Sequence, residues 1–342
     1  MKILFLADNS RDMSAAYLWR GLREVCGDDN VVDPINAYSL QGRSWANTED
    51  ADQMKMTGPV PATGHRVQKP GEDDFDILVG VASLLRTAGW DGFASLRKYL
   101  KPGGKVAYFD TLDSPLEIFP PPFAVDAVFR RETDPNVDYA KYYGRKPLVC
   151  LCAAPEAWFE EWEKWFDEKP RDVFCVHNAT TTGRAWPARW NCCTKVFQTN
   201  KWHDSMASSR GSLSLDDYLK IMPNYKLCVC APGGGDSSDS TRTWEAMARG
   251  SIPILAGHSC RVRPYWFCVG HPEREEIFEC SVDDLPKTID RALDMDLKPM
   301  RDRMKKHALA YHTTRKRAEQ FIDAIMNDYW KDPPAHLTWG LA

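Results

Sequence analysis

Short apolar runs alternate with amphipathic segments along the first half of the chain. The runs at residues 2–7, 76–81 and 105–109 have the length and residue types of buried strands, and residues 15–25 and 92–100 repeat their apolar positions with helical spacing. Strands that alternate with helices in this way predict a largely parallel sheet covered by helices on both faces.

The same alternation restarts after residue 170, beyond a linker at residues 145–170. The expected elements are strands at residues 172–176, 225–231, 252–255 and 278–280, helices at residues 215–221 and 241–249, and a basic helical tail at residues 300–330. A chain of 342 residues is long for a single hydrophobic core. We therefore expect an α/β protein whose two Rossmann-like domains, residues 1–150 and 151–330, face a central cleft, with a tail at residues 331–342.

Charge, hydropathy and cysteine spacing narrow the function classes. The formal net charge is −4, so no global basic field is available to hold nucleic acid, although a local basic groove stays open. No run of about 18 apolar residues occurs, so we expect no membrane span. The eleven cysteines include C-x-C and adjacent pairs rather than the C-x₂₋₄-C spacing of structural zinc. We expect a reduced, cytoplasmic protein without a zinc site, and we leave its oligomeric state open.

The most informative segment is YKLCVCAPGGGDSSDSTRTWEAMARGSIPIL, residues 225–255, which has the pattern of a buried strand, a glycine-rich turn, a helix and a second buried strand. The residues expected to contact a ligand in the turn are Gly233, Gly234 and Gly235, which permit close backbone approach, and the hydroxyl residues Ser237, Ser238, Ser240 and Thr241. Free amides and hydroxyls at the positive end of a helix form an anion site that suits a diphosphate.

Arg242 and Glu245 stand three residues apart and therefore share one face of the expected helix. The arginine can bind phosphate as a fork of donors, and the glutamate can accept from the two vicinal hydroxyls of a ribose. The plain alternative is an exposed ion pair on the helix surface. Their position directly after a glycine-rich turn favours the ligand-binding interpretation. A Walker A loop is excluded because no G-K-[ST] follows the glycines, and residues 7–12 lack the glycines of a dinucleotide-binding turn.

This segment resembles the signature of GT-B glycosyltransferases, most closely the exostosin-type and spore-maturation-protein-type families. The resemblance rests on Pro232, the glycines, Arg242, Glu245-Ala246, Gly250 and Ile252-Pro253-Ile254, and it extends weakly over residues 172–326. It implies a GT-B fold, an arginine on the diphosphate and a glutamate on the ribose of a nucleotide-sugar donor, for which we expect a UDP-linked sugar. It leaves the acceptor open, because these families draw acceptor contacts from the first domain.

Two further loops are expected to face the ligand. Asn178, Thr180 and Arg184 follow the first strand of the second domain, and His258 follows the strand at residues 252–255. They are candidate contacts to the nucleotide-sugar donor. The alternative is a polar turn whose side chains form hydrogen bonds with local backbone groups. The segment GRAWPARW, residues 183–190, interleaves cations with aromatic rings, which can hold bases or sugars or can simply pack.

Sugar transfer by an inverting route needs a base that takes the proton of the acceptor hydroxyl. Asp113 and Asp110 follow the strand at residues 105–109 and are the candidate catalytic residues, with Asx-turn formation as the alternative role. We expect no required metal and no cofactor, because Arg242 and helix-end amides can neutralise the diphosphate. The acceptor is a glycan or glycoconjugate, or a hydroxymethylated DNA base, and the alternative to an enzyme is a non-catalytic nucleotide-sugar-binding module.

Overall fold

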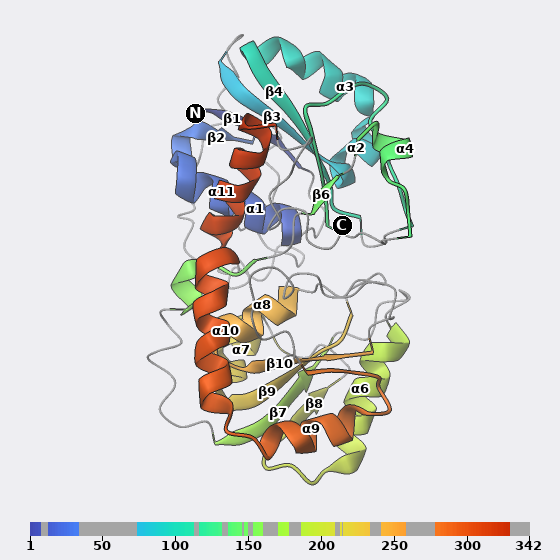
Figure 1. Cartoon of the computed structure of the whole chain (residues 1–342), viewed down its shortest axis with the longest axis vertical. Coiled ribbons are helices and arrows are strands. Elements are labelled where there is room, and N and C mark those ends of the chain that lie inside the picture. The colour runs from blue at the N-terminus through green and yellow to red at the C-terminus, as the bar shows by residue number, and fades with distance from the viewer. Residues whose placement is uncertain are drawn as a thin grey trace. The chain divides into compact units, whose positions relative to one another are not determined.

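The computed structural model is shown in Figure 1. It describes residues 1–7, 13–33, 74–112, 116–131, 136–145, 147–149, 153–159, 170–177, 186–208, 213, 215–232, 241–257 and 278–328. The chain divides into two compact units. Unit 1 comprises Met1–Cys152 with Thr314–Ala342, and unit 2 comprises Ala153–Thr313.

Unit 1 is built on a six-stranded parallel sheet with the strand order β2-β1-β3-β4-β5-β6. Its strands are β1 (Ile3–Leu6), β2 (Val31–Val32), β3 (Phe75–Val81), β4 (Leu100–Asp110), β5 (Ala127–Arg130) and β6 (Leu148–Val149). Its helices are α1 (Met13–Cys26), α2 (Ala82–Ala88), α3 (Trp90–Ser95), α4 (Ala140–Tyr143) and α11 (Thr314–Met326), with short 3₁₀ turns at Asp28–Asn30 and Leu96–Tyr99. The strands β1, β3 and β5 are buried almost throughout, and β4 is buried from Val106 onwards, as expected for a parallel sheet with two covered faces.

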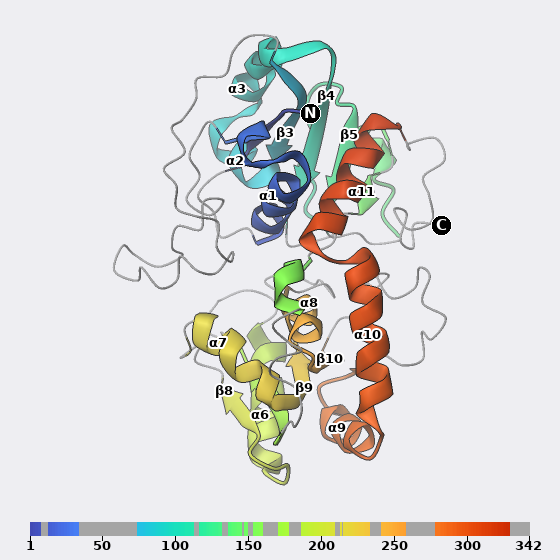
Figure 2. The same cartoon turned by 90° about the vertical axis from the view of Figure 1, so that its left-hand side faces the viewer.

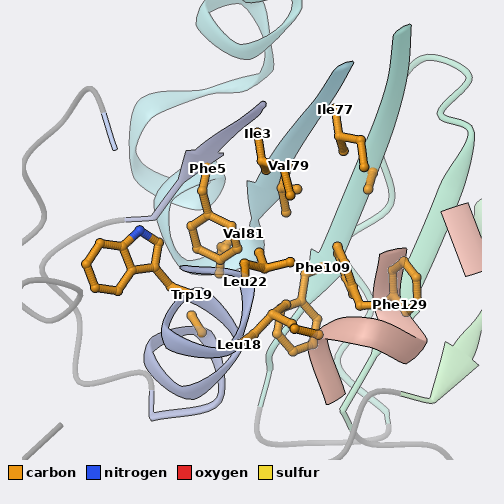
Figure 3. Packing of buried hydrophobic residues seen from close by; sticks show 14 of the residues in the cluster. Ile3, Phe5, Leu18, Trp19, Leu22, Ile77, Val79, Val81, Phe109 and Phe129 are labelled. Carbon is orange, nitrogen blue, oxygen red and sulfur yellow. The ribbon is translucent and has the colours of Figure 1, made fainter. Parts of the chain in front are cut away.

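One face of this sheet is covered by α1 and α11, which lie side by side in Figure 1 and Figure 2. Figure 3 shows Leu18 and Leu22 of α1 packed towards Phe5, Val81 and Phe109 of the strands. Together these side chains form a continuous apolar core, so burial of one helical stripe holds α1 on the sheet.

The final helix corrects the expected domain boundary, because α11 belongs to unit 1 and not to a domain that ends at residue 330. Its apolar face joins the core of the first sheet, where Phe321 stacks on Phe129 with ring centroids 4.0 Å apart. Gly21 of α1 permits this close packing, since a Cβ at that position would lie 2.0 Å from the Thr314 carbonyl oxygen. The helical pattern of residues 300–330 was visible in the sequence, but the surface that it covers was not.

Unit 2 contains a five-stranded parallel sheet with the order β11-β10-β9-β7-β8. Its strands are β7 (Arg171–Val176), β8 (Met206–Ser208), β9 (Tyr225–Cys230), β10 (Ile252–Ala256) and β11 (Phe278–Cys280). Its helices are α6 (Trp186–Thr199), α7 (Leu215–Ile221), α8 (Thr241–Ala248), α9 (Leu285–Leu293) and α10 (Leu297–Tyr311), with a 3₁₀ turn at Met222–Asn224. Because the strands are parallel, the residues that follow β7, β9 and β10 lie along one edge of the sheet.

The expectation of two Rossmann-like α/β domains is confirmed. The short edge strands β2, β6 and β8 were not predicted from the sequence. Residues 183–190 were predicted as a loop, but α6 begins at Trp186. No helix in the described ranges has both the length and the hydropathy needed to span a membrane. The described cysteines are free thiols: Cys26, Cys175, Cys192, Cys193, Cys228, Cys230 and Cys280.

Candidate functional site

The guanidinium of Arg242 is held in place at the start of α8, which follows the loop after β9. Its Nε donates to the Tyr218 Oη at 2.6 Å, and its Nη1 donates to the Nδ1 of His177. The guanidinium carbon also lies 5.3 Å from the centre of the Tyr218 ring, within the range of a cation–π contact. Two of the three guanidinium nitrogens therefore have fixed partners within the protein, and the direction in which the third points is fixed as well.

His177 directly follows β7 and is completely buried at the carboxyl edge of the sheet. Burial, followed by the positive charges of Arg242 and Arg189, holds the pKa of His177 well below its usual value. The imidazole is therefore neutral at physiological pH. Because an arginine can only donate, the Nδ1 that faces Arg242 carries the single lone pair of this neutral ring.

A second arginine, Arg189 of α6, lies close enough to Arg242 for the two charges to interact. Burial and the charge of Arg242 lower the pKa of Arg189 to about 10. Its Nε donates to the Pro232 carbonyl oxygen at 2.8 Å, which ties α6 to the chain leaving β9. Two like charges in a desolvated region repel one another, and an anion bound between them would relieve that repulsion. The sheet edge therefore has the electrostatics of an anion site.

Glu245 lies one turn after Arg242 on α8 and is only 5% exposed. Although burial alone would lower the pKa of Arg242, that pKa is raised, because Tyr218, Cys228 and Glu245 favour the charged guanidinium. Glu245 is therefore not part of a solvent-exposed ion pair on the helix surface, which was the alternative role considered for it from the sequence. A buried carboxylate beside a half-buried arginine suits a polar ligand better than it suits a helix surface.

Most of the other expected donor contacts lie outside the described residues. These are Gly233, Gly234, Gly235, Ser237, Ser238, Ser240, Asn178, Thr180, Arg184 and His258, together with the candidate base Asp113. Thr241 is placed as the first residue of α8, at the helix end where the sequence predicts the anion. The assignment of all these residues, including Thr241, to donor binding or catalysis stays a prediction.

Asp110, the other candidate base, is the last residue of β4 and is completely buried. Its Oδ1 accepts from the Leu112 amide at 3.1 Å, and its Oδ2 accepts from both the Arg130 Nη1 and the Tyr143 Oη. Burial raises the pKa of Asp110 against the opposing effect of Arg130. A general base needs an oxygen that can reach the acceptor hydroxyl, and Asp110 exposes neither oxygen. In this structure Asp110 forms a buried ion pair with Arg130, and its assignment as a catalytic base stays a prediction.

Three residues of this site, Tyr218, His177 and Arg189, were not predicted from the sequence as contacts to the nucleotide-sugar donor. The parallel-sheet rule offered one usable signal, since His177 directly follows a strand at its carboxyl end. Arg189 was noticed only as part of an aromatic and basic segment. Tyr218 gave no signal, because an aromatic residue at a buried helix position is ordinary core.

Replacing Tyr218 with phenylalanine should weaken nucleoside diphosphate binding by about fivefold, because it leaves the partly buried Nε of Arg242 without its acceptor at a cost of about 1 kcal/mol. Isothermal titration calorimetry measures this change. The matched control is Tyr225→Phe, since the Tyr225 Oη also accepts from an arginine, Arg171, at 3.2 Å, but at the start of β9. Equal affinities for the two variants and the wild type would remove Tyr218 from the site.

Comparisons with known proteins bear on the fold. No sequence profile of a known protein family matches the chain, and the search of curated proteins found no match. Among solved structures, the crystal structure of a glycosyltransferase from Rickettsia africae ESF-5 matches with a TM-score of 0.56 at 8% identity, covering 96% of this chain and 98% of that one.

Two other matches score too low to support an argument. The structure of the GtfA/B complex has a TM-score of 0.45 at 10% identity and covers 73% of this chain and 57% of that one. The structure of E. coli ADP-heptose lps heptosyltransferase II has a TM-score of 0.30 at 12% identity and covers 90% and 98%. The resemblance to exostosin-type and spore-maturation-protein-type families stays a prediction. What the comparisons show is the fold: this chain has two Rossmann-like α/β units and shares its fold with the Rickettsia africae structure.

Proposed function

We propose that this protein is a glycosyltransferase that moves a sugar from a nucleoside-diphosphate donor to an acceptor hydroxyl without a metal ion. The observation that carries the proposal is the half-buried Arg242, fixed by Tyr218 and His177 beside a second half-buried arginine, Arg189, at the carboxyl edge of the unit 2 sheet. The fold shared with a glycosyltransferase of known structure supports it.

The two arginines serve the leaving group of the reaction. Breaking the bond between the sugar and the diphosphate leaves negative charge on the diphosphate, which must be stabilised in the transition state. Arg242 presents its guanidinium in a fixed orientation, so no reorganisation is needed when that charge develops. The charge of Arg189 and the amide groups at the start of α8 add to this field. These groups take the place that a divalent cation occupies in metal-dependent transfer.

The nucleoside and acceptor sides follow from the neighbouring residues. Glu245, one turn beyond Arg242, accepts from the ribose hydroxyls of the donor, and Asp113 takes the proton of the acceptor hydroxyl. For the acceptor we propose a glycan or glycoconjugate. A DNA acceptor is less favoured, because Arg189 of the aromatic and basic segment donates to the Pro232 carbonyl oxygen beside Arg242, where we assign it to donor binding.

Changing Glu245 to glutamine should remove discrimination between ribo- and 2′-deoxyribonucleoside diphosphates, because an amide offers only one acceptor oxygen to the sugar. The wild type should bind the ribonucleotide at least about fivefold more tightly, in line with a loss of about 1 kcal/mol per hydrogen bond. Calorimetry with both nucleotides gives this ratio. Glu279→Gln on β11, an exposed position, is the control that should keep the wild-type ratio. A wild-type ratio in the Glu245 variant would place the ribose elsewhere.

The proposed function is tested by incubating the protein with nucleotide sugars and a glycan acceptor panel in excess EDTA, and by measuring released nucleoside diphosphate. Acceptor-dependent release in EDTA is the expected result. Loss of release in EDTA would overturn the metal-free claim. Tight donor binding without release for any acceptor would favour the alternative, a non-catalytic nucleotide-sugar-binding module.

A further inference from the structure

Three side chains that can bind a metal ion lie together in unit 2, and one of them, His177, contacts Arg242. Cys175 of β7 and His177 just after it are two residues apart, so they lie on the same side of the extended chain. Cys193 reaches them from α6, and its Sγ lies 3.8 Å from the Sγ of Cys175. The two sulfurs and an imidazole nitrogen all lie within 4.8 Å of one another, and all three residues are buried.

We propose that Cys175, His177 and Cys193 form a binding site for a soft divalent metal ion, Zn²⁺ or Cd²⁺, and that occupation of this site disables the donor site. Thiolate and imidazole are the ligands that these ions prefer in proteins. Two thiolates on one tetrahedral Zn²⁺ with bonds of about 2.3 Å stand about 3.8 Å apart. The sulfurs already have this separation, so they need not move to bind the ion.

The charge balance of the site also suits a divalent ion. Binding releases one proton from each thiol, so the ion and the two thiolates together add no net charge beside Arg242 and Arg189. The fourth coordination position is left for water or a solute anion. The spacing rule used on the sequence missed this site, because its ligands come from a strand and a separate helix rather than from a C-x₂₋₄-C turn.

The metal and Arg242 compete for the same lone pair. A neutral imidazole has one nitrogen lone pair, and in the structure that lone pair accepts from the Arg242 Nη1. If Nδ1 binds the ion, the arginine loses its acceptor directly. If Nε2 binds the ion, the ring proton moves to Nδ1, which then repels the guanidinium donor. Either coordination breaks the contact that orients Arg242, so metal and nucleoside diphosphate binding are antagonistic.

The metal half of the inference is tested without any assumption about catalysis. The reduced full-length protein, kept in a non-thiol reductant, is titrated with Cd²⁺ alone, and thiolate-to-cadmium charge-transfer absorption is recorded in the ultraviolet. We expect a band that saturates at one equivalent and is lost in Cys175→Ser and in Cys193→Ser. Cys192→Ser is the matched control, because Cys192 is the buried neighbour of Cys193 on α6 and its Sγ faces the Ala256 carbonyl instead. A missing band, or one that survives both cluster variants, overturns the site.

The antagonism is tested with protein loaded with one equivalent of Cd²⁺ and freed of excess metal by gel filtration, since nucleotides chelate free cations. This half rests on the proposed function. Nucleoside diphosphate affinity should fall by at least about tenfold in the loaded wild type and the loaded Cys192→Ser variant, a typical coupling between two sites. Metal-treated Cys193→Ser should keep its affinity. Unchanged affinity with bound Cd²⁺ overturns the antagonism. Failure of the metal-free protein to bind any nucleoside diphosphate overturns the proposed function, and the absorption titration still decides the metal site.

Discussion

Replacing Arg242 with alanine should strongly slow sugar transfer and weaken nucleoside diphosphate binding by about 10- to 100-fold. Charge-assisted hydrogen bonds contribute roughly 1.5–3 kcal/mol each, and the variant loses at least one such bond to phosphate. The loss in kcat should reach about 10²- to 10³-fold, because a preorganised donor to the leaving group acts most strongly in the transition state. Calorimetry and initial-rate assays measure the two effects separately.

Two further variants make this result specific to the fixed guanidinium of Arg242. Arg242→Lys keeps the charge but cannot donate to Tyr218 and His177 while also facing a phosphate, so its affinity should stay below wild type. Arg171→Ala removes an arginine at the opposite end of the same sheet, where it contacts Tyr225, and should bind normally. Unchanged diphosphate affinity in Arg242→Ala, with a normal circular dichroism spectrum, would contradict the donor site.

Replacing Asp110 with asparagine should lower the free energy of unfolding by about 3–5 kcal/mol, because it leaves the Arg130 guanidinium buried without its counterion. Both side chains of this pair are completely buried, and Tyr143 shares the same carboxylate oxygen. Urea denaturation followed by tryptophan fluorescence measures the change for the transition of unit 1. Nucleoside diphosphate affinity should not change, since the arginine cluster belongs to unit 2.

Asp126→Asn is the matched control for this prediction. Asp126 also accepts from a backbone amide of β4, that of Val106 at 2.8 Å, but its side chain is 42% exposed and its partner Lys105 is 3.9 Å away. Exposed pairs of this kind contribute about 1 kcal/mol or less. If Asp110→Asn were as stable as the control but lost at least about 10²-fold in kcat, Asp110 would be the catalytic base after all.

Hydropathy patterning predicted the elements that combine a long apolar run with a clear turn signal. The strands β3, β9 and β10 and the helix α8 fall within a residue or two of their expected bounds. Edge strands of two or three residues carry too little periodicity to be seen. The place of α11 was missed for another reason. A helical stripe shows that a face is buried but not which sheet it packs against. Here α11 packs against Gly21 and Phe129, which are far away from it in sequence.

Prediction of the site was limited in the same way. Arg242 and Glu245 could be proposed because a glycine-rich turn between a strand and a helix is a local signal. Asp110 gave a similar local signal at the end of a strand, but its partner Arg130 comes from the next strand and forms a buried ion pair with it. The contacts of Arg242 with His177 and Tyr218 join residues 65 and 24 positions apart. Such contacts depend on strand order and helix packing, which a local motif does not contain.

The central claim is that the carboxyl edge of the unit 2 sheet binds the diphosphate of a nucleotide sugar. Thermal unfolding of the wild type and of Arg242→Ala, in the presence of nucleoside diphosphates, nucleotide sugars and the parent nucleosides, tests this claim most directly. At about 100 times its Kd, a bound donor should add roughly 2.7 kcal/mol to the stability of the wild type. With diphosphates we predict this gain in the wild type and, at the same concentration, a gain of only about 0.4–1.4 kcal/mol in Arg242→Ala, and with nucleosides we predict little gain. Equal stabilisation of the variant and the wild type, or no stabilisation of the wild type by any diphosphate, would contradict it.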